Sequence, residues 1–401
     1  MADFGGADLE TFRNEARTWL EANFPDTLKR DPDQITQVMM AQATPSEDMK
    51  LWTRRMGEKG WGVPTWPKEY GGGGLSAAEA RVLQQEMTRV GARSPIGGMG
   101  VGMFGPTLLE YGNEEQKKRH IPPIARAELR WCQGFSEPGA GSDLAALATK
   151  CEDRSDHYLI NGSKIWTSGA QYADWCFCLV RTDQTKKHEG ISFILIDMKS
   201  PGVEVRPIRL ISGNSPFCET FFTDVKVPKE NLVGQLNHGW SIAKRLLQHE
   251  RNGMGNRMGE GNGTRAANVV DVAKTCVGTD EAGSIADADL RARLIVHRME
   301  EQALRQTVRR SQAEAKSNQG PRATTSIMKN ASMKVMQDRS ELMVEVLGSQ
   351  GLGWQGGGFD EAELDAVRGW LSGKAGSIYG GSQEIQNNII AKRILGLLDH
   401  Q

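Results

Sequence analysis

Apolar residues divide the chain into a helical region, a strand-like region and a second helical region. Up to about residue 125 they recur at three- and four-residue steps, as at Phe12 and Ala16, which is the period of an amphipathic helix. The stretches 77–92 and 114–126 repeat this spacing. We therefore expect residues 1–126 to form a helical domain.

From about residue 130 to residue 233 the apolar period changes to two. Short runs such as WCFCLV, ISFILID, VEVRPI and CETFFTDVKV lie between turn residues, a pattern typical of an antiparallel sandwich or barrel. Within YLINGSKIW (158–166), Asn161-Gly162 supplies the two residues that a type I′ hairpin turn prefers. We expect a central β-domain at 127–235 that contains this hairpin.

Helical spacing returns after Gly239 and continues to the end of the chain, which predicts a third domain at 236–401. A helix–sheet–helix order favours an α+β protein, mostly α, over a parallel doubly wound sheet.

The first helix of the third domain carries a carboxylate on its apolar face. At 100° per residue, Glu250 falls on the same stripe as Ala243, Leu247 and Met254. A carboxylate there costs desolvation energy unless it is paired or serves as a base. Spacing alone leaves both roles open, a general base or an ion pair with a nearby arginine.

Composition excludes several classes of protein. Hydrophobic residues make up 38% and charged residues 25% of the 401 residues, and the formal net charge is −1, so nothing favours a nucleic-acid partner. No apolar run approaches the roughly 20 residues of a membrane span. The acidic start MADFGGADLE does not resemble a signal peptide, and we expect a cytoplasmic protein. The six cysteines form no CxxC pair, which predicts buried reduced thiols rather than a disulfide or zinc framework.

Two stretches in the central region depart from plain strand and turn patterns. In WCQGFSEPGAGSDLAAL (131–147) a strand ends in a loop where Gly139, Gly141 and neighbouring serines expose amides and hydroxyls. Such a loop can wrap a planar or phosphorylated ligand, and an ordinary loop remains the alternative. Trp166 could form the wall of a cofactor site, or it could be a core tryptophan.

The stretch SIYGGSQEIQ (377–386) precedes a predicted helix with Ile385 and Ile389 on one stripe. Ser382 is placed to be the N-cap of that helix. Two glycines before a helix start allow a turn that comes close to a ligand, although a simple tight turn has the same pattern. No charged side chain stands at Gly380.

Together these segments resemble the acyl-CoA dehydrogenase family. The matching stretches are GFSEPGAGSDLAA, NGSKIWTSGAQYADW, FFTDVKVPKENLVG and IYGGSQEIQNNIIAKRILG. Their order and spacing fit across roughly residues 5–398, and several long motifs in register are far more specific than one.

The resemblance implies an N-terminal helical domain, a central antiparallel β-domain and a C-terminal four-helix bundle, assembled as a homo- or heterotetramer or as a dimer. It also implies FAD as cofactor and an acyl-CoA substrate. Members of the family remove the α-proton of the thioester and pass the β-hydride to flavin N5, and the electrons usually leave to an electron-transfer flavoprotein.

Site residues carried over from the resemblance fall on several segments. Gln350-Gly351 matches a glycine-rich loop that meets FAD from a neighbouring subunit, and the N–H of Gly380 matches a donor to the thioester oxygen. The resemblance also places Arg251 and Tyr379 at the substrate, with Ser142 reaching the CoA arm. The flavin contacts are Gln133, Phe135, Ser136, Gly141, Ser142, Trp166, Ser168, Ser382 and Glu384.

The chain departs from the family pattern in two places. An arginine followed by Phe-Gly, which commonly reaches the FAD pyrophosphate of the partner subunit, is missing from VVDVAKTCVGTDEAGSIAD, so another residue or subunit would have to supply the cation. Many members carry the base directly after Ile-Tyr, where this chain has Gly380. Some place it instead on the helix that opens the last domain, just before an arginine, which corresponds here to Glu250 and Arg251.

Two alternatives to a self-sufficient dehydrogenase stay open: an auxiliary or non-catalytic subunit of a hetero-oligomer, and a related flavin oxidase. The resemblance places SPIGGMGVGMFG (94–105) along the acyl pocket. Its five glycines and two methionines predict a wide cavity for a broad or branched acyl group, or else they allow close helix packing.

Overall fold

The computed structural model describes residues 6–31, 33–39, 44–259, 268–316 and 324–398, and the side chains of 250–259 are not among the described ones. The chain divides into two compact units. The first unit comprises Met1–Ile208 and Pro216–Glu250, and the second comprises Arg209–Ser215 and Arg251–Gln401. Each unit is described by itself. The predicted division at 1–126, 127–235 and 236–401 stays a prediction.

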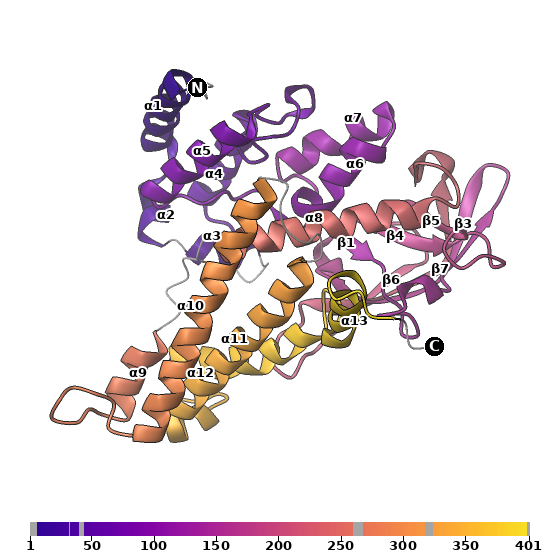
Figure 1. The fold of residues 1–401 in the computed structure, drawn as a ribbon. Coiled ribbons are helices and arrows are strands. Elements are labelled where there is room, and N and C mark those ends of the chain that lie inside the picture. The colour runs from indigo at the N-terminus through magenta and orange to yellow at the C-terminus, as the bar shows by residue number, and fades with distance from the viewer. Residues whose placement is uncertain (1–5, 32, 40–43, 260–267, 317–323, 399–401) are drawn as a thin grey trace. The chain divides into compact units, whose positions relative to one another are not determined.

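The first unit opens with helices, as the apolar spacing predicts (Figure 1). Phe12 and Ala16 are buried on α1, and the predicted helices 77–92 and 114–126 correspond to α5 and α7. The helices are α1 (Gly6–Asn23), α2 (Asp26–Arg30), α3 (Asp33–Met39), α4 (Glu47–Glu58), α5 (Ala77–Arg89), α6 (Gly105–Tyr111) and α7 (Glu114–Ala125), with a π-helical turn η2 at Gly100–Phe104.

A buried carboxylate joins the first and fifth helices. Glu86 on α5 accepts hydrogen bonds from Arg13 and Arg17 of α1 and from Arg89 of its own helix. Its side chain is only 3% exposed. Hydrogen bonds, first from Arg17, lower the pKa of Glu86 to about 2 although burial opposes this. Because one buried charge meets three guanidinium groups, this contact is a specific α1–α5 lock.

Eight strands form one mixed sheet in the order β6-β7-β3-β2-β4-β5-β8, with β1 parallel beside β4. All pairings are antiparallel except β1–β4 and β2–β4, and β2 meets β4 only at Lys150 and Arg181. The strands are β1 (Trp131–Gly134), β2 (Lys150–Asp153), β3 (His157–Ser168), β4 (Trp175–Arg181), β5 (Ile191–Asp197), β6 (Val203–Ile208), β7 (Phe217–Pro228) and β8 (Leu232–Val233).

The continuously apolar strand β4 is buried on both faces. Phe177 and Leu179 belong to the core shared with the N-terminal helices. Cys176 and Val180 point the other way, into a core shared with β3 and β7. Two halves of the sheet therefore enclose a second core, which agrees with the predicted antiparallel-rich β-domain.

The predicted hairpin at Asn161-Gly162 is wrong, because both residues lie inside the single strand β3. The side-chain amide of Asn161 exchanges two hydrogen bonds of 2.9 Å with Asp224 on β7. A Cβ at Gly162 would clash with Thr149. The Asn-Gly pair thus marks a register shift against β7 and a close backbone approach, two known uses of glycine in a strand.

The second unit is helical, with α11 in contact with α9, α10, α12 and α13. Together with the first unit this gives the predicted α+β class. Its helices are α9 (Val269–Cys276), α10 (Ala288–Lys316), α11 (Thr324–Val346), α12 (Glu361–Gly373) and α13 (Gln383–Arg393), and its core is formed by Val269, Ala273, Ile285, Leu290, Leu294, Leu342, Met343 and Val346.

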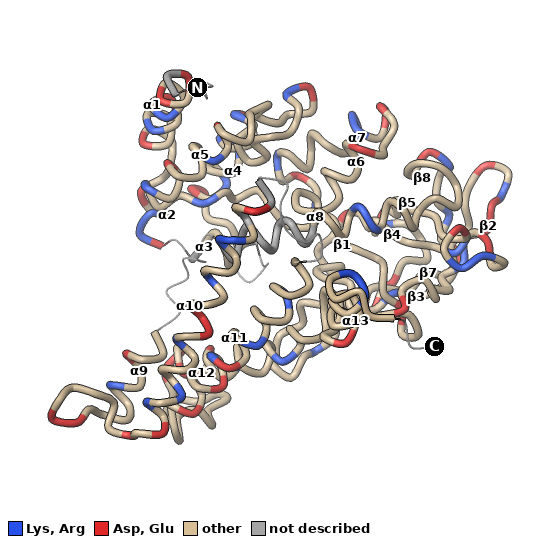
Figure 2. The backbone as a smooth tube through the Cα atoms, viewed as in Figure 1, with Lys and Arg blue, Asp and Glu red and all other residues tan. Residues whose placement is uncertain are grey.

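Charged residues are spread over both units (Figure 2), and most of the cysteines are buried. Basic and acidic residues are intermixed along the helices of both units (Figure 2). The prediction of buried reduced thiols is confirmed for five cysteines, whereas Cys276 is exposed at the end of α9. Within the part of the chain that the structure describes, no helix is long and apolar enough to cross a membrane.

Candidate active site

The loop between β1 and β2 presents backbone amides to solvent. Glu137 and Ala140 exchange two hydrogen bonds of 3.0 Å across Pro138-Gly139. In the described residues, the N–H groups of Gly139, Gly141 and Ser142 find no acceptor, and a Cβ at either glycine would touch nothing. This segment, the 139–142 loop, can therefore approach a ligand closely with free donors.

A buried ion pair holds the start of this loop. The side chain of Lys164 on β3 is fully buried, and its Nζ lies 2.7 Å from Glu137 Oε1 and 3.2 Å from the Phe135 carbonyl oxygen. The Glu137 carboxylate also accepts the N–H groups of Ala148 and Thr149, at 2.7 and 2.8 Å. Burial alone would raise the pKa of Glu137, but the charge of Lys164 and these hydrogen bonds hold it below its usual range.

The far side of the loop is held by Arg181 at the end of β4. Its guanidinium donates to the carbonyl oxygens of Ala145 and Leu147, at 2.6 and 3.2 Å, and to those of Lys186 and Lys187. Sequence reasoning missed both Lys164 and Arg181. A buried lysine or arginine in a strand has no period or motif that marks it, because its partners are distant in sequence.

Trp166 stands beside this loop in an unusual conformation. It lies in a bulge of β3, has a φ of 60° and is 53% exposed as a residue. The N–H of the preceding residue, Ile165, donates to Ser136 O at 2.9 Å, which joins the tryptophan strand to the loop. The left-handed backbone and the large exposed ring exclude the alternative of a core tryptophan.

The remaining predicted residues of the first unit differ in exposure. Gln133, Ser136 and Ser168 are half-buried, whereas Gly141 and Ser142 are exposed. Phe135 is buried, and its ring packs edge-on against two core phenylalanines. Any role for Phe135 at the site therefore falls to its backbone.

The turn at Gly380-Gly381 in the second unit also exposes amides. Both glycines have positive φ, 66° and 92°. Ser382 is the N-cap of α13, as predicted, and accepts the Ile385 N–H at 3.4 Å. The N–H groups of Gly380, Gly381 and Ser382 meet no acceptor in any described residue, so the turn can offer them to a ligand.

The other predicted residues of the second unit lie beside the turn or at the 3-10 helix Gly348–Leu352. Tyr379 and Glu384 are exposed, and a hydrogen bond from Ser382 lowers the pKa of Glu384. Gln350 donates to the Gly358 carbonyl at 3.2 Å and to Glu363 at 3.3 Å. Gly351 is buried against α11, where a Cβ would clash with the Val344 carbonyl.

Helix α8 (Gly239–Gly259) contains the predicted base. Its first turns bury Ile242, Ala243 and Leu246, and Arg245 forms a two-armed ion pair with Glu110 of α6 at 2.7 Å. The buried face agrees with the predicted stripe through Ala243. The side chains of Glu250 and Arg251 lie outside the described residues.

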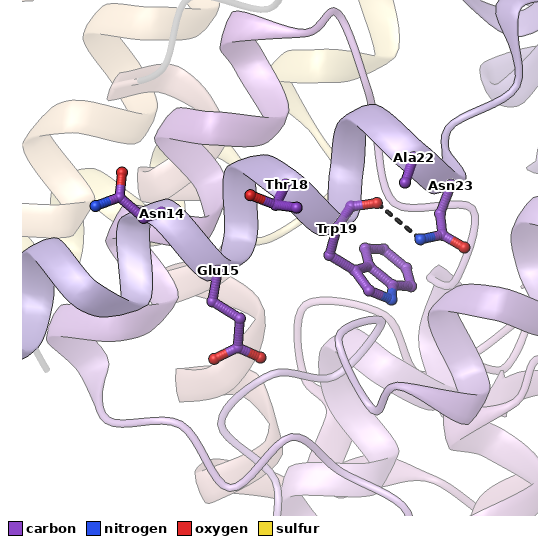
Figure 3. A pocket seen from close by; sticks show the side chains of 6 residues that line it. All are labelled: Asn14, Glu15, Thr18, Trp19, Ala22 and Asn23. Atoms are coloured by element: carbon purple, nitrogen blue, oxygen red, sulfur yellow. Dashed lines mark hydrogen bonds between the residues drawn. The ribbon is translucent and has the colours of Figure 1, made fainter.

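One surface pocket of the first unit is formed by α1 alone and has no part in this site (Figure 3). Its one charged group, Glu15, pairs with Lys59 at 2.9 Å. The lining residues are Asn14, Glu15, Thr18, Trp19, Ala22 and Asn23.

Comparison with known proteins decides the family. Three family models match in succession: the N-terminal domain of acyl-CoA dehydrogenases at residues 7–128, the middle domain at 132–225 and the C-terminal domain at 237–395. The chain belongs to the acyl-CoA dehydrogenase family. It is thus an oxidoreductase, as the sequence motifs predicted.

Individual relatives are similar to this acyl-CoA dehydrogenase over nearly its whole length. The acyl-CoA dehydrogenase IpdE1 of Mycobacterium tuberculosis (strain ATCC 25618 / H37Rv) is 34% identical over 97% of this chain and 98% of its own. A solved structure described as the Tcur3481-Tcur3483 steroid ACAD is 29% identical, covers 98% of both chains and has a TM-score of 0.76. The ChsE4-ChsE5 complex of Mycobacterium tuberculosis is 27% identical over 100% of both chains, with a TM-score of 0.72.

Membership in this family implies a flavin cofactor, and the residues present fit one. A flavin nucleotide combines a planar ring with a phosphate or pyrophosphate group. The exposed ring of Trp166 can cover a planar group, and the free amides of the 139–142 loop can bind an anionic one.

Proposed function

We propose that this acyl-CoA dehydrogenase, with FAD as its cofactor, introduces a double bond between Cα and Cβ of an acyl-CoA thioester. The observation that carries this proposal is the Gly380–Ser382 turn, whose exposed N–H groups have no acceptor among the described residues. A thioester loses its α-proton readily when donors stabilise the negative charge that develops on its carbonyl oxygen. The Gly380 N–H is one such donor.

In this proposal the residues carried over from the family resemblance hold the cofactor. Ser136, the 139–142 loop, Trp166 and Ser168 hold the flavin, and the family resemblance adds contacts from Ser382 and Glu384. Gln350 and Gly351 face the FAD of a neighbouring subunit. When bound, FAD accepts the hydride that leaves Cβ.

Glu250 takes the α-proton in this scheme. Helical spacing places it on the stripe of Ala243, which is buried, and Gly380 has no side chain that could be a base instead. Arg251 and Tyr379 contact the substrate, and Ser142 reaches its CoA arm. The alternative role for Glu250 is a structural ion pair. Glu250→Gln distinguishes the two roles: loss of a base lowers the turnover rate, whereas loss of an ion pair lowers the stability of the fold.

The test is anaerobic addition of acyl-CoA to the FAD-loaded enzyme while flavin absorbance is followed. We expect the absorbance to fall with at least one thioester of a panel that contains straight, branched and polycyclic acyl groups. Glu110→Gln is a matched carboxylate control next to α8 and should respond like wild type. Unchanged absorbance with every thioester would contradict the proposal.

A bulky acyl group is the substrate class that we propose. Gly98 and Gly102 are exposed, and a Cβ at either position would touch nothing, so the predicted acyl-pocket segment leaves space. Two solved relatives at 29–30% identity are described as a steroid ACAD. We expect a polycyclic acyl-CoA to reduce the flavin faster than a short straight one, and the reverse order would exclude this class.

A paralogous partner chain is a second proposal, and a specific observation favours it. The Arg-Phe-Gly motif is missing from residues 269–287, and two solved relatives, Tcur3481-Tcur3483 and ChsE4-ChsE5, carry the names of two different chains. Flavin content and gel filtration of the chain expressed alone test this. A flavin-loaded homotetramer would exclude an obligatory partner, whereas a flavin-free chain would favour the auxiliary role.

We propose an electron-transfer flavoprotein as the electron acceptor. The alternative, a flavin oxidase, differs in its reaction with oxygen. Mixing the reduced enzyme with oxygen should reoxidise it slowly, and electron-transfer flavoprotein should reoxidise it quickly. Rapid reoxidation by oxygen alone would favour the oxidase.

A further inference from the structure

Two side chains hold the carbonyl groups of the Gly380–Ser382 turn. Lys329 Nζ on α11 donates to the Gly381 carbonyl oxygen at 2.8 Å. Gln386 Nε2 on α13 donates to the Gly380 carbonyl oxygen at 3.1 Å, and its side chain is buried. Successive carbonyls of the turn are thus held from two helices of the same unit.

These contacts determine where the N–H groups of the turn point. In a planar trans peptide the carbonyl oxygen and the following N–H lie on opposite sides, so the Gly381 N–H points away from Gln386 and the Ser382 N–H away from Lys329. On the other side of Gly380, the Tyr379 N–H is held by Ala375 O at 3.1 Å. The peptide that carries the Gly380 N–H therefore lies between two peptides that are each held by a hydrogen bond.

Because both turn residues are glycines, hydrogen bonds are needed to hold the backbone in one conformation. Gly380 and Gly381 both occupy the left-handed region, and glycine has more backbone freedom than any other residue. A Cβ at Gly381 would clash with the amide of Gln386, so the close contact requires glycine. The same glycine increases the conformational freedom of the turn. Without the two donors, the N–H groups would sample many directions.

The charge of Lys329 has no carboxylate partner at ion-pair distance among the described residues. It is half-buried, burial lowers its pKa, and Glu384 opposes that shift only from a distance. A partly desolvated ammonium with one carbonyl acceptor keeps much of its charge unbalanced by protein groups. The Lys329 ammonium polarises the Gly381–Ser382 peptide. Its charge therefore favours a negatively charged atom in front of the three free N–H groups of the turn.

We propose that Lys329 and Gln386 are positioning residues that aim the Gly380 N–H at the thioester oxygen. This inference rests on the proposed function. Neither residue touches the substrate or the flavin, and both act through the backbone of the turn.

The test compares Lys329→Met with Lys329→Arg in the FAD-loaded enzyme. We expect Lys329→Met to lower kcat about 10-fold, less than the roughly 10²–10³-fold loss that follows removal of an oxyanion donor itself. KM should change less than about twofold, because the carbonyl contact strengthens in the transition state. Lys329→Arg keeps a cationic donor and should recover most of kcat.

Two matched controls separate positioning from mere packing. Asn330 Nδ2 donates to Asn387 Oδ1 at 2.8 Å and is another tie between α11 and α13. Lys334 is a lysine of α11 that pairs with Glu300. Asn330→Ala and Lys334→Met should both keep wild-type kcat.

Hydrogen exchange of residues 378–386 gives a readout that does not depend on turnover. We expect faster exchange in Lys329→Met and in Gln386→Met, and wild-type exchange in Asn330→Ala. If Lys329→Met does not fold, Gln386→Met carries the same test. Wild-type kcat and exchange in the folded variant, or an equal loss of kcat in Asn330→Ala, would overturn the inference. A wild-type enzyme that no acyl-CoA reduces would instead reject the proposed function, while the exchange data would still decide whether Lys329 orders the turn.

Discussion

The 139–142 loop and the Gly380–Ser382 turn both expose free amides, but they are held in different ways. A buried ion pair, Glu137 with Lys164, holds the loop and satisfies two further N–H groups. A half-buried lysine and a neutral glutamine hold the turn, and no carboxylate lies at ion-pair distance from that lysine in the described residues.

The difference lies in which side chains hold each segment and how their charges are balanced. The Glu137–Lys164 pair fixes the start of the loop and adds little net field, and the buried guanidinium of Arg181 adds positive potential at its far side, which suits a loop that must match an anionic cofactor. Lys329 at the turn fixes the backbone and, with no carboxylate at ion-pair distance in the described residues, adds positive potential, which suits a group that must stabilise charge during a reaction. We infer that the loop serves binding and the turn serves catalysis.

Breaking the buried pair should have the largest effect on stability. Lys164→Met leaves the Glu137 carboxylate buried and unpaired, and we expect a loss of about 3–5 kcal/mol in the free energy of unfolding, measured with urea. The control is Lys187→Met, which removes an exposed ion pair with Asp143 at the same loop and should cost about 0–1 kcal/mol. Equal effects of the two variants would show that the buried pair does not hold the loop.

Acid should weaken the loop as the Glu137 carboxylate becomes protonated. The folded-state pKa of Glu137 is lowered, so its contribution is present above the unfolded value of about 4.3 and is lost as pH falls through the folded value, with about 1.4 kcal/mol for each unit of difference. Unfolding measured between pH 6 and pH 2 should therefore show a shallower pH slope in Glu137→Gln. The same slope in both proteins would exclude this contribution.

Trp166 tests whether the loop region serves binding. Trp166→Gly relieves a left-handed backbone conformation that costs a non-glycine residue about 1 kcal/mol or more, so stability should stay equal or rise. FAD affinity should fall about 2- to 10-fold, since a ring contact is worth about 0.5–1.5 kcal/mol. The measurements are thermal unfolding of the apoprotein and flavin titration. A large loss of stability with unchanged affinity would make Trp166 a structural residue.

The smallest effect on stability should come from the turn. Lys329→Met removes one half-buried hydrogen bond, and we expect a change of about 1 kcal/mol in the free energy of unfolding, although kcat falls. A stability loss as large as that of Lys164→Met would remove the distinction between the two regions.

Sequence patterns predicted the parts of this fold that depend on local spacing. The helices α5 and α7, the strands β4 and β5 and the N-cap Ser382 follow from period and capping chemistry alone. The hairpin at Asn161-Gly162 failed because the residues that keep β3 straight, Asp224 and Thr149, come from elsewhere in the chain.

The same limit applies to the site. Motifs located both amide-presenting segments, because glycine spacing is local. The residues that hold them could not be found in this way. Lys164 lies 27 residues from Glu137 and Lys329 lies 52 residues from Gly381, and nothing in their immediate sequence distinguishes them from surface lysines.

The central claim is that Glu250 is the base, since Gly380 has no side chain that could serve as one. Its most direct test is rapid anaerobic mixing of the Glu250→Gln variant with acyl-CoA. We expect flavin reduction to slow by about 10²–10⁴-fold, the usual contribution of a general base, with FAD content and urea stability equal to wild type. Reduction at the wild-type rate, or loss of folding without a specific loss of rate, would contradict the assignment.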